Sequence, residues 1–283
     1  MNDCQNLAVS MFFQPDWLEC LLEDCEREAI DYQNVKLLKL EGRSAIWNVC
    51  MMLDCLSHGV PGQACHLFER YLYRLLNNQG NLSDPQSRVA IIENIMPRFL
   101  LMITCCVQLS AKMSSADTHN HASLLKMALL AKGVLYSTEE IIATEEEIFK
   151  MLDFRIPLWT SVDMGELLAT ELKLPSHIIK AVARIVDLSE YYREDIEKKV
   201  VWAANLSSTY QNITSIRSLH LSAGSVAAAV RLSPLRPDVA PALARLLRIP
   251  QAYVECLRDV ILKQMTSHRT TPTILKRKKS ASS

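Results

Sequence analysis

The segment FLLMITCCVQLSAK, residues 99–112, constrains the fold more than any other part of the chain. It predicts a helix with almost no polar face, and a soluble helix that is apolar all round is wrapped by other helices. Residues 99–107, the longest apolar run, reach only about half the length that a membrane span requires. We therefore expect no transmembrane segment, and a central buried helix that ends on Lys112.

The composition favours a helical protein with a large core. The chain has 283 residues, of which 49% are hydrophobic and only 7 are glycine, and it holds long segments of Leu, Ala, Met, Glu and Lys. We expect an all-α fold. The acidic Asp3 and the lack of a basic region before an apolar stretch argue against a secretory signal, so we expect the chain to stay inside the cell. The 9 cysteines are then reduced core residues.

The charge is balanced overall but not along the chain. Residues 1–159 hold 13 Lys/Arg against 20 Asp/Glu, and residues 160–283 hold 18 against 11. Five of the seven excess positive charges are Arg269 and the run Lys276, Arg277, Lys278 and Lys279. The folded part of the second half is thus only weakly basic, and we expect no direct nucleic-acid binding. The basic run fits a nuclear-import patch or, alternatively, a solvated terminus.

Helical periodicity indicates two groups of five helices with a linker centred on Pro157. In each group the third helix is the most apolar. A capping box at Ser137 and Glu140 marks the start of the fifth helix of the first group. The expected helices are residues 44–56, 63–76, 97–112, 122–132 and 138–154, then 162–172, 177–192, 219–232, 239–247 and 251–264. The expected domains are an N-terminal helical extension (1–42), a first box (43–157), a divergent second repeat (158–266) and a basic tail (267–283).

The known catalytic motifs are missing from the sequence. It contains no glycine-rich dinucleotide or phosphate loop, no HExxH and no GxSxG, and its Ser, His and Asp residues show no recognisable spacing. Cys50 with Cys55, and Cys65 with His66, do not match the spacing of a zinc site. We expect a binding protein rather than an enzyme, with no cofactor, metal or small-molecule substrate.

Glu145 is the most informative polar residue. At about 100° per residue, Ile141, Ile142 and Ile148 lie within about 60° of it, which places this carboxylate in the middle of an apolar helical face, while Glu146 and Glu147 point away. One interpretation is a half-buried acceptor at an edge of the molecule that takes hydrogen bonds from a partner's backbone. The alternatives are an internal pair with a neighbouring Lys or Arg, or a helix end in water.

Lys112 ends the central helix. A cation there is favoured by the helix dipole, and its stem can lie along apolar surface, so alone it indicates little. Together with Glu145 it places a donor and an acceptor near the ends of two buried helices. That combination suits a grip on one end of a helix of another protein.

These features resemble the cyclin fold. CCVQLSAKMSS (residues 105–115) is similar to a cyclin signature, and TEEEIFKMLDFRIPLWT (144–160) is similar to the fifth cyclin helix and the linker that follows it. The strings QACHLFERYL (63–72) and CVQLSAKMS (106–114) further resemble a divergent cyclin-like family of meiotic crossover regulators. The resemblance covers about the first 165 residues well and the remainder only by pattern.

The resemblance implies a function and partners. Lys112 and Glu145 fall on the lysine and glutamate with which cyclins hold the regulatory helix of a cyclin-dependent kinase. The family implies a non-catalytic regulator of meiotic crossover designation and maturation, located in the nucleus on meiotic chromosomes, with the cytoplasm as a second location. Its expected partners are a cyclin-dependent kinase and recombination proteins.

The chain also departs from ordinary cyclins. Ser44 and Val49 stand near the places where cyclins keep a paired arginine and aspartate, so the resemblance predicts that this pair is lost. Ala45, Ile46 and Trp47 remain as a possible hydrophobic docking surface. Ser114 and Ser115 replace an acidic pair that often follows the signature lysine.

Three other functions stay open at this point. The first is a cyclin-fold scaffold that works without a kinase, which the departures favour. The second is an ordinary cyclin that regulates cell-cycle kinase activity. The third is a DNA-binding cyclin fold of the general-transcription-factor kind, against which the near-neutral core and the missing zinc ribbon argue.

Overall fold

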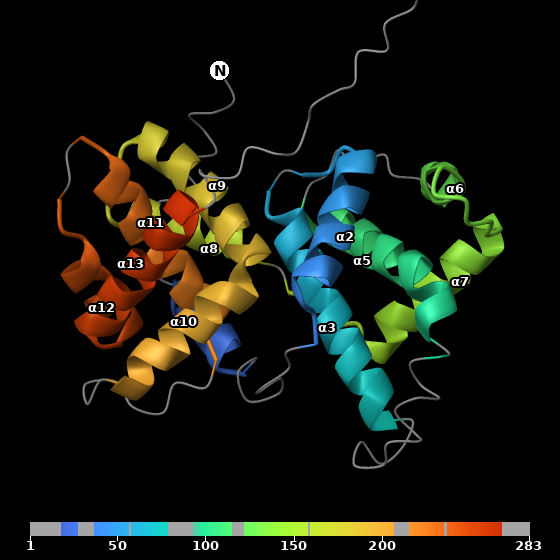
Figure 1. Ribbon diagram of the computed structural model, residues 1–283, viewed down its shortest axis with the longest axis horizontal. Helices are drawn as coiled ribbons and strands as arrows, with labels where there is room; N and C mark the ends of the chain where they lie inside the picture. The colour runs from blue at the N-terminus through green and yellow to red at the C-terminus, as the bar shows by residue number, and fades with distance from the viewer. Residues whose placement is uncertain are drawn as a thin grey trace, which may run out of the picture.

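The computed structural model describes residues 18–27, 37–56, 58–78, 93, 95–114, 122–157, 159–206, 215–234 and 237–267. Within these ranges every regular element is a helix, which confirms the all-α expectation. The helices form two groups that lie side by side (Figure 1). No helix in the described ranges is long and apolar enough to cross a membrane.

The first group, called the first repeat, surrounds the apolar helix predicted from the sequence (Figure 1). Its members are α2 (Leu40–Met52), α3 (Val60–Asn78), α5 (Phe99–Ser114), α6 (Ala122–Leu130) and α7 (Thr138–Met151). A short 3-10 helix, η1 (Met96–Arg98), holds Pro97 and leads into α5. All five predicted helices are present, although α2 begins four residues before the predicted residue 44.

Local contacts explain where these helices begin and end. The amide of Leu38 donates to Glu69 Oε1 at 3.1 Å, which fixes the chain just before α2. The predicted capping box of α7 is confirmed, since Ser137 and Glu140 each accept from the other's backbone amide. Helix α7 stops at Met151 rather than at the predicted Phe154 because Asp153 and Phe154 adopt left-handed backbone angles.

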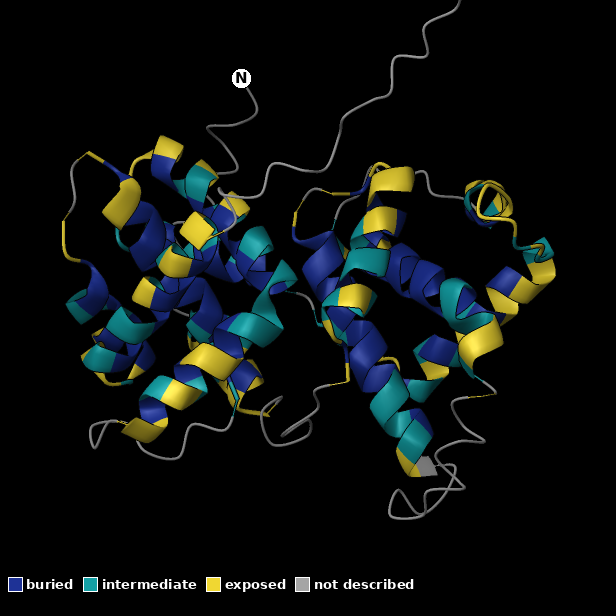
Figure 2. Ribbon diagram, in the orientation of Figure 1, coloured by how far each residue is buried: buried dark blue, intermediate teal, exposed yellow. Residues whose placement is uncertain are grey.

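Helix α5 is the centre of the first repeat. Every residue from Leu101 to Ala111 is buried. Figure 2 shows this helix as an almost continuous buried ribbon between α3 and α7. The prediction of a wrapped central helix is therefore confirmed. Its buried neighbours include Phe68 and Tyr71 on α3 and Ile148 on α7.

The second group, called the second repeat, has its own core. Its helices are α8 (Ser161–Glu171), α9 (Ser176–Tyr191), α10 (Arg193–Leu206), α11 (Ser218–Leu232), α12 (Ala240–Leu247) and α13 (Gln251–Ser267). Helix α11 is central and is buried from Leu221 to Val230. Its small residues permit close packing: a Cβ added at Gly224 would lie 2.6 Å from the Cβ of Leu257 on α13.

Helix α10 corrects the prediction of five helices in the second half. Its sequence REDIEKKVVWAANL is mostly polar or weakly apolar, which hid the signal. Its buried apolar residues, Ile196, Val200 and Ala204, are spaced four apart and form a narrow stripe. That stripe packs on the core of the second repeat, mainly against α13.

The N-terminal extension belongs with the second repeat in space. Residues 18–27 form a helix whose buried residues, Leu21 and Cys25, join the second core. Its acidic residues Glu19, Glu23 and Asp24 are exposed. Within the predicted extension (1–42), this stretch is a helix with one docked apolar face, and residues 1–17 and 28–36 lie outside the described ones.

Candidate functional site

Lys112 lies in the last turn of α5, where the buried part of the helix ends. The preceding residue, Ala111, is fully buried, whereas the Lys112 side chain is 49% exposed. The position therefore combines a buried backbone with a charged group in water. A cation in this turn is also stabilised by the helix dipole.

Glu145 lies beside Lys112 across the contact between α5 and α7. Its Oε1 is 2.5 Å from Lys112 Nζ, and its side chain is 16% exposed. The structure thus brings the two predicted site residues together, and each is the other's partner. The sequence left three interpretations of Glu145 open. The geometry matches the second of them, an internal ion pair with a neighbouring lysine.

The environment of Glu145 differs on its two sides. Ile141 and Ile148 are buried as predicted, but Ile142 is 52% exposed. Glu145 therefore lies at the margin of the apolar face of α7 rather than at its centre. The difference arises because α7 packs on α5 through a narrower stripe than the apolar residues alone suggest.

Burial and charge also act on Cys105, a thiol of α5 that feels the charges of this pair. Burial raises the pKa of Cys105 to about 12, and the negative charge of Glu145 contributes to the rise. The Cys105 thiol donates to the carbonyl of Ile141 at 3.6 Å. At neutral pH this cysteine is a protonated core residue, so the site offers no thiolate nucleophile.

The part of the chain that carries Lys112 and Glu145 also holds exposed apolar side chains. They come from α5, α6, α7 and the turn between α6 and α7, and Figure 1 shows α6 and α7 on the outer side of the first repeat. They are Met113, Leu124, Met127, Leu130, Leu135 and Ile142. Exposed apolar side chains with a few polar groups among them are typical of a surface that takes an amphipathic partner helix.

Glu147 has a structural role that the sequence did not reveal. It was expected to point away from the apolar face, but it accepts from the hydroxyl of Tyr71 at 2.7 Å and from Arg98 at 2.9 Å. This polar cluster joins α3, η1 and α7. The three residues lie far apart in the sequence, so no local pattern indicates their contact.

The proposed hydrophobic docking surface does not form as predicted. Ile46 is fully buried in the first core, and Trp47 packs edge-to-face on Tyr191 of α9 with ring centroids 5.2 Å apart. Ala45 is partly buried against the same core. These residues face inward or toward the second repeat because α2 lies at the junction of the two groups.

An arginine–acid pair is present where the resemblance predicted its loss. The pair uses Arg43, one residue before Ser44, and Glu69 on α3, with Nη2 and Oε2 3.3 Å apart. Both side chains are buried. Arg43 also donates to the backbone carbonyl of Glu190 at 3.1 Å, so the pair reaches the second repeat.

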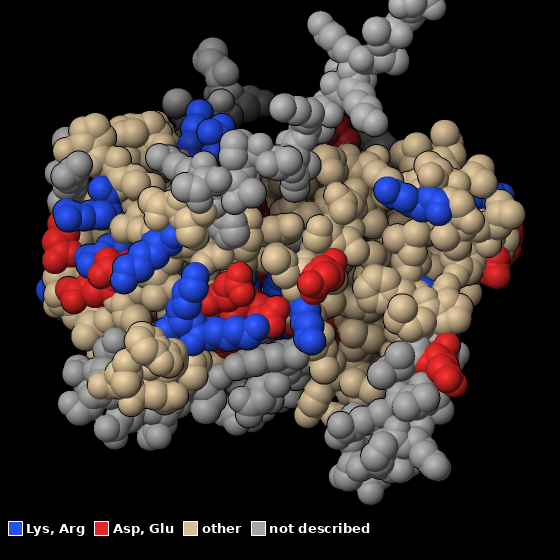
Figure 3. Space-filling view, in the orientation of Figure 1, with Lys and Arg blue, Asp and Glu red and all other residues tan. Residues whose placement is uncertain are grey.

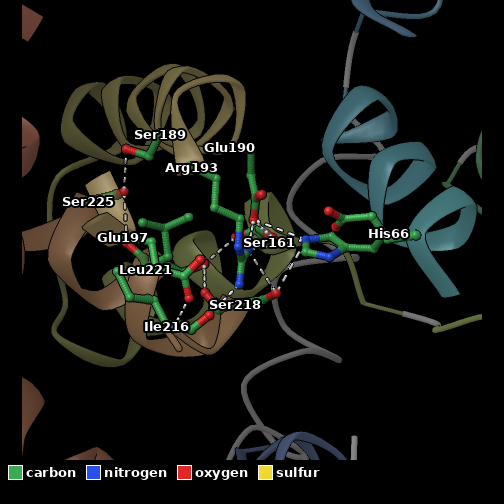
Figure 4. Close-up of polar contacts among 12 residues, drawn as sticks. His66, Ser161, Ser189, Glu190, Arg193, Glu197, Ile216, Ser218, Leu221 and Ser225 are labelled. Carbon is green, nitrogen blue, oxygen red and sulfur yellow. Dashed lines mark hydrogen bonds and ion pairs between the residues drawn. The ribbon is translucent and has the colours of Figure 1, made fainter. Parts of the chain in front are cut away.

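Glu190 is the centre of a buried polar network between the repeats (Figure 4). Its Oε1 accepts from Ser161 at 2.5 Å and from Arg193 at 2.8 Å, and it lies 3.3 Å from His66 Nε2. Burial by itself would raise the pKa of Glu190, but Arg193, His66 and Arg43 hold it well below its usual range.

Arg193 extends this network to the start of α11. It donates to the carbonyl of Ile216 and, at 3.3 Å, to the hydroxyl of Ser218 (Figure 4). The amide of Ile216 donates to Glu197 at 2.8 Å. Glu190 is negligibly exposed, and its neighbours Arg43, His66 and Arg193 come from α2, α3 and α10. The network therefore fixes how the two repeats meet.

The predicted nuclear-import patch lies outside the described residues; it consists of Lys276, Arg277, Lys278 and Lys279. Among the described residues, no group of three or more His, Cys, Asp or Glu side chains could hold a metal ion.

Comparison with known proteins gives two kinds of match. The chain is 26% identical over 170 residues to human cyclin N-terminal domain-containing protein 1, covering 55% of this chain and 52% of the relative. It is 27% identical over 171 residues to the mouse protein of that name. The match thus spans about half the length of each curated relative. No family model matches the chain.

A solved structure shows the fold. The X-ray structure of a viral cyclin from herpesvirus saimiri matches with a TM-score of 0.57 and 15% identity, covering 87% of this chain and 96% of the viral one. The match spans both repeats, since it covers most of the chain. The expected cyclin fold is therefore confirmed.

Proposed function

We propose that this chain is a non-catalytic regulator that binds a cyclin-dependent kinase through the edge formed by Lys112, Glu145 and the exposed apolar side chains of α5, α6 and α7. The observation that carries the proposal is the ion pair at the end of the buried central helix, where exposed Met113 follows Lys112 and exposed Ile142 lies one helical turn before Glu145. The cyclin fold of the viral neighbour supports the choice of partner.

The internal ion pair is compatible with partner binding. With Lys112 about half exposed, the pair contributes at most about 1 kcal/mol to folding. A partner helix can donate backbone hydrogen bonds to Glu145 and accept one from Lys112. These bonds would replace the ion pair with little loss of free energy. Covering Ile142 and its apolar neighbours would then supply the favourable free energy of binding.

We extend the proposal to meiotic recombination. Similarity to relatives named cyclin N-terminal domain-containing protein 1 agrees with the family suggested by the strings at residues 63–72 and 106–114. In this proposal the chain acts in the nucleus, promotes crossover designation and maturation, and binds recombination factors besides the kinase.

A kinase-independent scaffold is the second candidate, and two observations favour it. Lys112 and Glu145 already satisfy each other. The hydroxyl of Ser114, which stands where cyclins often keep an acid, donates to the carbonyl of Ala111 in its own helix. An ordinary cell-cycle cyclin is the third candidate, and kinase activity toward a histone substrate distinguishes the first and third from the scaffold.

A paired-variant experiment tests kinase binding. The variant carrying both Lys112→Ala and Glu145→Ala is compared with one carrying Glu146→Ala and Lys150→Ala, which removes an exposed ion pair from the same helix. Each is co-expressed with a panel of cyclin-dependent kinases. We expect the first variant to lose the kinase on co-purification and the second to retain it. Equal yields from both would leave the scaffold as the better account.

A further inference from the structure

A hollow of about 360 Å³ lies on the second repeat. It is far in sequence from the edge around Lys112 and Glu145, which is called the kinase edge. It is bounded by the last two turns of α11, the segment just before α12, and the middle of α13. Its lining includes Ala227, Arg231, Asp238, Val239, Glu255 and Arg258. Its size falls in the lower part of the range of protein binding pockets.

The hollow contains the counterpart of Lys112. Lys112 lies thirteen residues after Phe99, which begins α5, and Arg231 lies thirteen residues after Ser218, which begins α11. Both are the basic residue in the last turn of a buried central helix. The two repeats therefore each place a cation at the end of their central helix.

The two cations differ in what they contact. Lys112 is paired with Glu145, whereas the exposed side chain of Arg231 makes no hydrogen bond or ion pair with any residue that the structure describes. Neither of the acids that line the hollow, Asp238 and Glu255, forms an ion pair with Arg231. Glu255 accepts from Gln251 at 2.7 Å, and Asp238 accepts from the amide of Ala240 at 3.1 Å.

Arg258, the other cation of the hollow, is already held by an acid. Its Nε lies 2.8 Å from Asp259 Oδ1. Glu255 and Asp238 lie close enough to contribute to the raised pKa of Arg258, after the larger effect of Asp259. Arg231 is thus the lining cation with free donors.

These charges select the chemistry of a ligand. A guanidinium with free donors takes a carboxylate through two parallel hydrogen bonds. The carboxylates of Asp238 and Glu255 would repel a doubly charged phosphate or a nucleic-acid backbone. Each carboxylate can still accept further hydrogen bonds from a basic side chain. Ala227 and Val239 supply an apolar wall. A peptide with both charges fits these groups better than a purely anionic ligand.

We propose that this hollow is a second protein-docking site, which takes a peptide segment of a partner with an acidic residue for Arg231 and, within one helical turn of it, a lysine or arginine for Asp238 and Glu255. The site is separate from the kinase edge. The proposal stands whether or not the chain binds a kinase.

Peptide selection on the full chain tests this proposal. A phage-displayed library of random twelve-residue peptides is selected against the wild-type protein, and synthetic versions of the enriched peptides are measured by fluorescence anisotropy. We expect peptides that carry the acid–base pair, and we expect Arg231→Glu to weaken their binding by about tenfold or more. Arg231→Gln, which keeps the size of the side chain, should weaken it less.

Two controls separate the hollow from general charge effects. Arg245→Glu makes the same charge change at an exposed position of α12 outside the hollow and should leave binding unchanged. Lys112→Glu should also leave it unchanged. The proposal is overturned if no enriched peptide is sensitive to Arg231→Glu, if the sensitive peptides are purely acidic, or if replacing their acid by phosphoserine strengthens binding.

Discussion

In the first repeat the central helix is built largely from large side chains, whereas in the second it is built largely from small ones. Helix α5 buries Leu101, Met102 and Ile103, while α11 buries a run of Ala, Gly and Ser. The small residues let α13 approach α11 closely, as the clash expected at Gly224 shows. The two cores are therefore packed in different ways. Large side chains fill the space around α5, whereas small side chains let neighbouring helices approach the backbone of α11.

The surfaces of the two repeats differ as well. In Figure 3, charged side chains of both signs gather over the second repeat and at the junction, while the visible face of the first repeat is mostly uncharged. The first repeat combines an internally paired lysine with exposed apolar groups, and the second presents an arginine without a described partner. The two repeats therefore present different chemistry at their surfaces.

The largest expected effect comes from breaking the junction that joins the repeats. Glu190→Ala removes the buried ion-pair partner of Arg193, and we expect it to lower the free energy of unfolding by about 3–5 kcal/mol. Because Glu190 connects the two cores, chemical denaturation should then show two transitions. Glu194→Ala, which removes a more exposed acid of α10, should cost less than about 1 kcal/mol. A Glu190→Ala loss as small as that of the control would refute the role of the network.

The second prediction concerns the close packing of α11. Gly224→Ala forces its new Cβ against the Cβ of Leu257, which cannot move without its helix, and we expect a loss of about 2 kcal/mol. Gly42→Ala on α2 is the matched control, because its Cβ meets only the flexible end of Leu38. That control should change stability by less than about 1 kcal/mol. Equal effects in thermal unfolding would show that the two repeats do not differ in packing.

A third prediction uses an acid of α9 that lies three residues before Glu190. Burial raises the pKa of Asp187 to about 7, with Glu190 and Glu166 contributing, and its Oδ1 has no partner within the described structure. Its folded-state pKa exceeds the ordinary value of 3.8, so stability falls as pH rises from about 4 to 7 and stays lower above that.

Asp187→Asn should remove this pH dependence. We expect the variant to be more stable than the wild type by about 1–2 kcal/mol at pH 8, and by less at pH 5, where the folded wild-type carboxyl is already protonated. Urea titrations at the two pH values provide the measurement. A variant that is less stable than the wild type at pH 8 would show that the Asp187 carboxylate is favourably partnered.

The smallest stability effect is expected at the kinase edge. Lys112→Ala removes a half-exposed ion pair and should lower the free energy of unfolding by less than about 1 kcal/mol. Loss of kinase binding by this variant would then report on the interface rather than on folding. Thermal unfolding of the purified variant checks this, and a loss above about 2 kcal/mol would mean that the pair is structural.

Local and periodic signals predicted much of this fold. The wrapped helix α5 and the capping box of α7 depend on residues within one helix, and both were predictable. Helix α10 was missed because its buried stripe of three residues is surrounded by charges. Helix bounds shifted where a distant contact intervened, as Glu69 does before α2.

The polar contacts were harder to predict than the helices. The cyclin resemblance and the helical angle placed Glu145 near Lys112, and the structure shows them in contact. Glu147 and Glu190 were missed because their partners come from other helices, up to 147 residues away in the sequence for Glu190. The direction of Ile46 was wrong because α2 lies at the junction between the repeats, which a single helix pattern does not reveal.

The proposed kinase edge is tested most directly by a charge swap that preserves the internal ion pair. The variant with Lys112→Glu and Glu145→Lys keeps opposite charges facing each other but reverses what a partner meets. Its affinity for a purified cyclin-dependent kinase is measured by calorimetry beside that of the wild type. Our account predicts an unchanged melting temperature and a loss of affinity of about thirtyfold or more. Wild-type affinity of the swapped variant would contradict it.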